Sequence, residues 1–134
     1  MRKPRYAIIL RWLGTVTWTA LTVLLMTLPA GEDSMIDELS GLFGGSDLTD
    51  AIGHVILFGV LTLLWRGTLA LYGPPARALR LAVVIAALLG TATEASQVLV
   101  AERGAAPWDL LANWLGAGLA ALWAGRRNGA GALR

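Results

Sequence analysis

Three segments of the chain each carry two polar side chains at the spacing of an α-helix, and these pairs are the best candidates for a chemical site. They are Asp50 with His54, Glu94 with Gln97, and Asp109 with Asn113. Residues three or four apart lie on the same face of a helix. Each segment is therefore predicted to present both of its polar groups in one direction.

These side chains, together with Arg103, could support acid–base, phosphate-binding or metal-binding chemistry. His54 is the only histidine and could move protons near neutral pH, with Glu94 as a second acid or base. Arg103 could hold a phosphate through two hydrogen bonds. The carboxylates of Asp50, Glu94 and Asp109 could hold a hard divalent cation. The chain has no cysteine, which excludes thiolate chemistry and disulfides.

Four of the polar residues also have a purely structural interpretation. Asp50 and Asp109 could each cap the start of a helix, where the helix dipole favours an acid. Gln97 and Asn113 could simply hydrogen-bond a neighbouring helix. For these four residues, ligand binding and structural support are both open hypotheses.

Glu94 and His54 are harder to explain by structure alone. Ionisable groups inside apolar runs are rare and usually functional. Even so, Glu94 could form a buried ion pair with Arg103, and His54 could hydrogen-bond another helix. Catalytic roles for His54 and Glu94 are therefore one hypothesis among these.

The segments that must position these residues are long and apolar. The chain has 134 residues, 56% hydrophobic and 15% charged, whereas soluble domains are about 45–50% apolar and about 25% charged. The apolar residues fall in four runs. In helical form, the length of each run is close to the thickness of the hydrocarbon core of a bilayer. We predict an all-α membrane protein, a compact four-helix transmembrane bundle with helices over residues 12–29, 51–71, 79–100 and 108–124.

The basic residues fall on alternate connections and predict the orientation of the helices. They gather in residues 1–11, around the connection 72–78 and in the tail 125–134, whereas the loops 30–50 and 101–107 contain a single Arg between them. Because positive residues favour the cytoplasmic side, we expect both termini in the cytoplasm and both loops outside the inner membrane. The first apolar run is longer than that of a signal peptide, so we expect it to be retained.

Two further features refine this arrangement. Within the acidic outer loop, residues 34–43 have apolar side chains at helical spacing after a capping serine, which predicts a short interfacial helix. Trp18 and Trp114 lie deep in their runs and are expected to pack between helices.

The predicted orientation brings all seven polar residues to the outer ends of the helices. A charge that faces lipid costs at least ~2.5 kcal/mol at the bilayer centre and less near the interface. We therefore expect the three polar pairs to face inward, towards one another, as a shared site at the outer leaflet.

Taken in order, these segments resemble a known family. DAIGHVILF at 50–58 is followed by TEASQ at 93–97, then Arg103, then WDLLANWLGAG at 108–118. This order is similar to that of the VanZ-like family of small bacterial integral membrane proteins, whose pattern is Asp before His and Phe, then Glu-x-x-Gln, an Arg, and Asp-x-x-x-Asn. The resemblance covers residues 50–118, about half the chain. Ala51 departs from it, because the family often has Lys there.

The resemblance implies a protein of the bacterial cell envelope, in the inner membrane, with a role in low-level resistance to the glycopeptide teicoplanin. It singles out the same seven polar residues as the candidate site. It implies no particular reaction and no cofactor.

Three functions fit the predicted site. The first is binding of a lipid headgroup or a partner membrane protein, with Arg103 and His54 meeting a phosphate. The second is a lipid-modifying enzyme, a hydrolase or transferase acting on a phospholipid or polyprenyl phosphate through His54 and Glu94. The third is a small transporter or channel subunit, although transporter sites usually lie at the midplane.

Two kinds of association can be judged from the sequence. The net charge of +2 does not indicate nucleic-acid binding, because the basic residues flank apolar runs. Small residues from Gly116 to Ala124 allow close helix contact, which we expect within one bundle rather than at a dimer face. The sequence does not set the oligomeric state.

Overall fold

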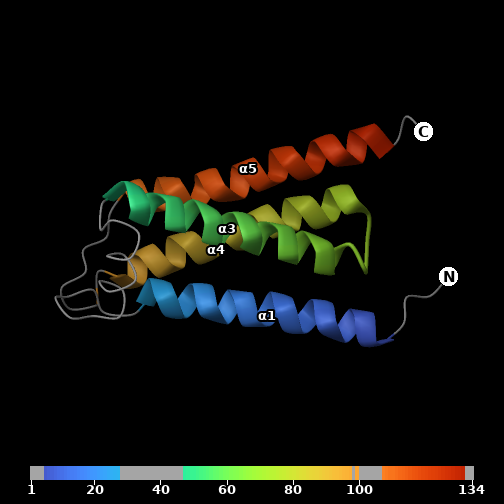
Figure 1. Cartoon of the computed structure of the whole chain (residues 1–134), viewed down its shortest axis with the longest axis horizontal. Coiled ribbons are helices and arrows are strands. Elements are labelled where there is room, and N and C mark those ends of the chain that lie inside the picture. Colours follow the sequence, from blue (N-terminus) through green and yellow to red (C-terminus); the bar gives the residue numbers. More distant parts are fainter. Residues whose placement is uncertain (1–4, 28–46, 98, 100–106, 132–134) are drawn as a thin grey trace.

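The computed structural model describes residues 5–27, 47–97, 99 and 107–131, and these residues form four long α-helices (Figure 1). The helices are α1 (Arg5–Thr27), α3 (Asp47–Leu69), α4 (Pro75–Gln97) and α5 (Pro107–Gly131). The predicted all-α fold with a four-helix bundle is confirmed. The predicted interfacial helix at 34–43 lies outside the described residues.

Three of the four helices are long and apolar enough to cross a membrane. Among the described residues these are α1, residues Leu48–Leu69 of α3, and α4. Large apolar side chains such as Leu13, Leu88 and Leu122 are exposed on the outside of the bundle, whereas several polar side chains are buried. This distribution suits a protein surrounded by lipid.

The prediction of a fourth membrane-spanning segment at 108–124 is not supported in that form. The residues are helical within α5, but α5 is not apolar enough to count as a candidate span. Asp109, Asn113 and the tryptophans of this helix lower its mean hydropathy. The structure thus shows a small membrane protein with three candidate spans, and the positions of the two termini across the membrane stay a prediction.

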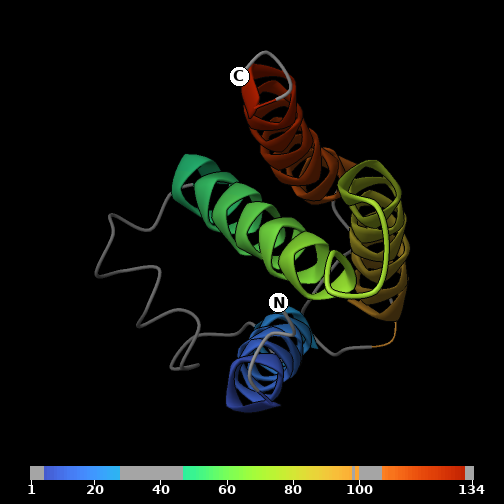
Figure 2. The same ribbon diagram turned by 90° about the vertical axis from the view of Figure 1, so that its right-hand side faces the viewer.

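The helices run alternately up and down. The ends of α1 and α4 and the starts of α3 and α5 lie at one end of the bundle, while the start of α1 and the end of α5 lie at the other (Figure 1). α3 lies between α1 and α5 and contacts all three other helices (Figure 2). This topology gathers the three predicted polar pairs at one end.

The turn between α3 and α4 follows from two prolines. Pro75 is the first residue of α4, a position where the missing N–H is not needed and the fixed φ suits the helix. The carbonyl of Pro74 accepts the first hydrogen bond of the helix, from the Ala78 amide at 3.0 Å. As a result α4 begins before residue 79, where the predicted span started.

Glycine allows α3 and α5 to approach closely. A Cβ atom on Gly116 would lie 2.3 Å from the carbonyl oxygen of Val55, so no other residue fits there without a shift of the backbone. Ala117, Ala120 and Ala124 continue the buried face of α5. The expected packing of small residues within the bundle is thus seen at Gly116, Ala120 and Ala124, whereas a Cβ atom on Gly118 would meet nothing within 4 Å.

Four threonines of α1 return their hydroxyls to the backbone of their own helix. The hydroxyls of Thr15, Thr19, Thr22 and Thr27 donate to carbonyls four residues earlier at 2.7–2.9 Å, which makes threonine tolerable in lipid. Thr15 also lies 2.8 Å from the hydroxyl of Thr68 in α3.

The two deep tryptophans behave differently. Trp18 donates its indole N–H to the Leu57 carbonyl of α3 at 3.1 Å and packs against the core, so its predicted place between helices is confirmed. Trp114 is 47% exposed, and its predicted place was wrong. Because Asn113 faces α3, the next residue along the helix points away from the bundle.

Candidate functional site

His54 is the central residue of the polar cluster. It lies in the second turn of α3 and its side chain is 1% exposed. Its Nδ1 atom is 2.8 Å from Oδ1 of Asn113 in α5. An amide oxygen can only accept a hydrogen bond, so Nδ1 carries the proton and donates it. The second ring nitrogen, Nε2, is then left with a lone pair.

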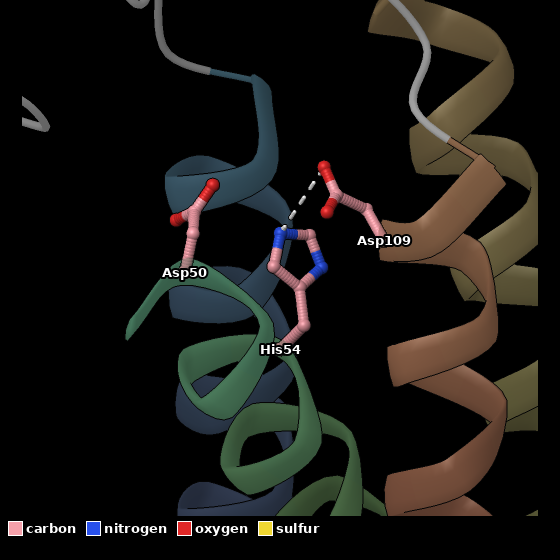
Figure 3. Close-up of side chains that lie close together, drawn as sticks. All are labelled: Asp50, His54 and Asp109. Atoms are coloured by element: carbon pink, nitrogen blue, oxygen red, sulfur yellow. Dashed lines mark ion pairs between the residues drawn. The ribbon is translucent and has the colours of Figure 1, made fainter. Parts of the chain in front are cut away.

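The Nε2 atom of His54 faces a carboxylate across the gap between α3 and α5. Oδ2 of Asp109 is 3.9 Å away, and the Asp109 side chain is 21% exposed (Figure 3). Within the part of the chain that the structure describes, no group forms a hydrogen bond with Nε2. A buried nitrogen of this kind has the geometry of a base or of a metal ligand.

Asp50 completes a cluster of three ligand-type side chains. It lies one helical turn before His54 and is exposed to the surroundings. Asp50, His54 and Asp109 each offer one atom, and these atoms all lie within 4.8 Å of one another. The His54 ring lies between the two carboxylates, which come from the starts of two different helices (Figure 3).

The helix ends support the negative charge of this cluster. Asp109 belongs to the first turn of α5, and Asp50 is the fourth residue of α3. The N-terminal ends of α3 and α5 carry unsatisfied N–H groups and a partial positive charge, which favour nearby carboxylates. The predicted N-cap role of Asp50 is wrong, because α3 begins three residues earlier, at Asp47. The favourable field at these helix starts is compatible with a role of both carboxylates in ligand binding.

Asn113 holds the histidine ring from a tightly packed position. It is 1% exposed, and its Nδ2 atom has no hydrogen-bond partner among the described residues. On the side of α4, a Cβ atom on Gly90 would lie 3.1 Å from the Cβ of Asn113 and 3.2 Å from the ring of Phe58. The ring orientation of His54 is therefore fixed by contacts with α5, which are in turn supported by α4.

Glu94 and Gln97 occupy the last turns of α4 and are both buried, 6% and 1% exposed. Glu94 follows Gly90 by four residues and so shares the helix face that packs against Asn113. It is not part of the three-residue cluster with His54. The carboxylate set considered from sequence, Asp50 with Glu94 and Asp109, is thus not the set that lies closest together among the described residues.

Gln97 points towards a different helix. Its Nε2 atom donates to the carbonyl of Met26, in the last turn of α1, at 3.0 Å. The last carbonyls of a helix lack partners within it, so Gln97 caps α1. Its Oε1 atom has no hydrogen-bond partner in residues 5–27, 47–97 and 107–131. Arg103, the remaining predicted residue, lies outside the described residues.

Two glycines make the site close; sequence reasoning named Gly116 only as part of a run of small residues, and it missed Gly90. Gly116 lies one turn after Asn113, and Gly90 lies one turn before Glu94. A glycine inside a helix costs up to ~1 kcal/mol relative to alanine. A glycine one turn from a candidate polar residue, on the same face, was therefore a usable signal of close helix approach.

These features define a class of protein: a small all-α membrane protein with three candidate spans and a buried polar cluster at one end of its bundle. Comparison of the chain with protein-family models, with curated proteins and with solved structures finds no match.

Proposed function

We propose that this chain is a multi-pass protein of the bacterial inner membrane that binds the headgroup of a membrane lipid at the polar end of its bundle. The observation that carries the proposal is His54, fully buried yet held by Asn113 with a free lone pair at the end of an apolar bundle. Lipid headgroups contact a membrane protein at the ends of its membrane-spanning helices. The resemblance to the VanZ-like family supports the same placement and adds a proposed role in teicoplanin-type resistance.

In this proposal α5 crosses the membrane as a fourth span, which returns both termini to the cytoplasm. It packs against both α3 and α4 (Figure 2). Its polar residue Asn113 is buried, while the residues that face outward, such as Leu111, Leu115 and Leu119, are apolar. Lipid therefore meets a more apolar surface than the average composition of the helix indicates.

A binding assay with defined lipids tests the proposal. The full chain, purified in detergent, is titrated with phosphatidylglycerol, phosphatidylethanolamine and a polyprenyl phosphate, and binding is followed by native mass spectrometry. We expect one headgroup class to bind preferentially and the preference to be lost in Asn113→Leu. The control is Thr91→Val, at an exposed position of α4 whose hydroxyl bonds only its own helix. Equal retention of all lipids, or an unchanged preference in Asn113→Leu, contradicts the proposal.

A second candidate function is a lipid-modifying enzyme, favoured by the orientation of the histidine. With Nδ1 held as a donor, Nε2 of His54 is placed as a general base beside Asp109. Glu94 would act as a second acid or base.

Incubation of the protein with phospholipids and polyprenyl phosphates, followed by mass spectrometry of the lipids, tests this candidate. Catalysis predicts altered headgroups with the natural chain and none with His54→Gln. Lipids that stay unchanged under every condition, including added Mg²⁺, Mn²⁺ and Zn²⁺, argue for binding alone.

A further inference from the structure

We propose that Asp50, His54 and Asp109 together bind one divalent transition-metal ion, of the Zn²⁺ or Mn²⁺ type. The ion binding itself is independent of the lipid proposal. Only its last consequence, that the ion receives a phosphate oxygen of a headgroup, rests on the proposed function.

The three side chains have the right chemistry for such an ion. Imidazole nitrogen suits zinc and other transition metals, whereas carboxylate oxygen suits magnesium, calcium and manganese as well. One imidazole with two carboxylates therefore favours Zn²⁺ or Mn²⁺ over a purely hard cation. Three protein ligands also leave at least one coordination position open, as in zinc sites that bind a substrate or water.

The histidine is already prepared as a ligand. Metal-binding histidines usually donate their other ring N–H to a fixed acceptor, which sets the tautomer and the ring direction. Here Nδ1 donates to Asn113 at 2.8 Å. Nε2, on a side chain that is 1% exposed, faces the two carboxylates and forms no hydrogen bond with the described residues. That unsatisfied buried nitrogen is the observation, separate from the acidic pair, that points to a ligand.

The distances allow an ion to enter with small movements. Two ligands at ~2.0–2.1 Å from one tetrahedral zinc lie ~3.3–3.4 Å apart. The Nε2–Oδ2 distance is 3.9 Å, and the three ligand atoms lie within 4.8 Å of one another. The carboxylates of exposed Asp50 and partly exposed Asp109 can rotate inward, while the buried ring stays in place.

The charge of the site also calls for a cation. Asp50 and Asp109 bring two carboxylates to one point, and Glu94 is buried on the adjoining face of α4. An anionic phosphate would be repelled by these groups alone. A bound divalent ion reverses the local field and provides an open position for a phosphate oxygen.

Metal binding is tested on the full chain in detergent, without added lipid. The protein is treated with a chelator, dialysed against Zn²⁺ or Mn²⁺, and its metal content measured, with Co²⁺ absorption in the visible range as a second readout. We expect about one ion per chain. Asp50→Asn, His54→Gln and Asp109→Asn should each weaken binding by at least ~10–100-fold, since even loss of an outer partner of a metal ligand costs that much.

Two further variants make the result specific. Asn113→Leu removes the partner of Nδ1 and should weaken binding by ~10–100-fold. Thr91→Val, at an exposed position of α4 whose hydroxyl bonds only its own helix, is the control and should leave the metal content unchanged. Because Asp50 is exposed, Asp50→Asn is expected to fold normally, and it keeps the test valid should the His54 variant fail to fold.

Two results would overturn the inference: natural protein that binds no more metal than Asp50→Asn, or a folded His54→Gln variant that binds metal as well as Thr91→Val. The same samples are then titrated with lipid, with and without Zn²⁺. Metal binding without lipid binding supports this inference and refutes the proposed function, whereas lipid binding without metal does the reverse.

Discussion

Replacing Gly116 by alanine should open the contact between α3 and α5 and disturb the polar cluster without touching any of its residues. A Cβ atom at this position would lie 2.3 Å from the Val55 oxygen and 3.0 Å from its Cα and carbonyl carbon. All three atoms belong to backbone, so no side chain can rotate away.

The size of the effect follows from this geometry. Ordinary contact begins at 3.4 Å, so the two helices must separate locally by about 1 Å to restore van der Waals distance. Asn113 lies one turn from Gly116, and its 2.8 Å bond to His54 would lengthen beyond hydrogen-bond range. Overpacking costs ~1–3 kcal/mol and the lost hydrogen bond ~0.5–1.5 kcal/mol, offset by up to ~1 kcal/mol from the better helix propensity of alanine.

Gly118→Ala is the matched control, because a Cβ atom there meets nothing within 4 Å. It should be neutral or stabilising by up to ~1 kcal/mol. Both variants are compared by thermal and denaturant unfolding in the same detergent, and by the metal titration described above. If Gly116→Ala is as stable as Gly118→Ala and binds metal equally well, then the close helix contact does not set the geometry of the site.

Three further predictions concern the rest of the bundle. Gly90→Ala crowds Asn113 and Phe58 and should lower the free energy of unfolding by ~1–3 kcal/mol in denaturant titrations; an unchanged midpoint would show that the ring and the amide can yield. Gln97→Leu leaves the Met26 carbonyl of α1 without its 3.0 Å donor and should cost ~0.6–1.7 kcal/mol, so equal melting temperatures would contradict the capping role. The chain lacks cysteine, so a single cysteine added at either terminus reports topology: neither should react with an impermeant thiol reagent in intact cells, and labelling of only one would place three spans in the membrane.

The sequence predicted the helices and the side of each helix that carries polar residues, but not which helices pack against those sides. Helical spacing put Asp109 and Asn113 on one face of their helix, because a period of 3.6 residues fixes the direction of each side chain around the helix axis. It could not reveal that Gln97 turns to α1 whereas Asn113 turns to α3. That choice depends on which helices are neighbours, and the neighbours are set by contacts such as Gly116 with Val55 that involve no polar residue.

The combination of possible metal ligands shows the same limit. From the sequence, Asp50, Glu94 and Asp109 were possible ligands of a divalent cation, because hard cations prefer oxygen. The structure instead groups His54 with Asp50 and Asp109, with one ligand atom of each within 4.8 Å of the others, and Glu94 is not in this group. Ligand identity follows from the relative height and rotation of three helices, and these quantities are absent from the order of residues along one chain.

The low hydropathy of α5 and the polar cluster are two aspects of one feature. Asp109 and Asn113 make the helix too polar to count as a candidate span, yet they are the residues through which α5 engages His54. An average over the helix counts them as if lipid surrounded every side. Because Asn113 is buried against α3 and α4, its amide does not contact lipid, and the free-energy cost of exposing a polar group to lipid does not arise. The feature that weakens the sequence signal for a fourth span is thus the same feature that supports a site between the helices.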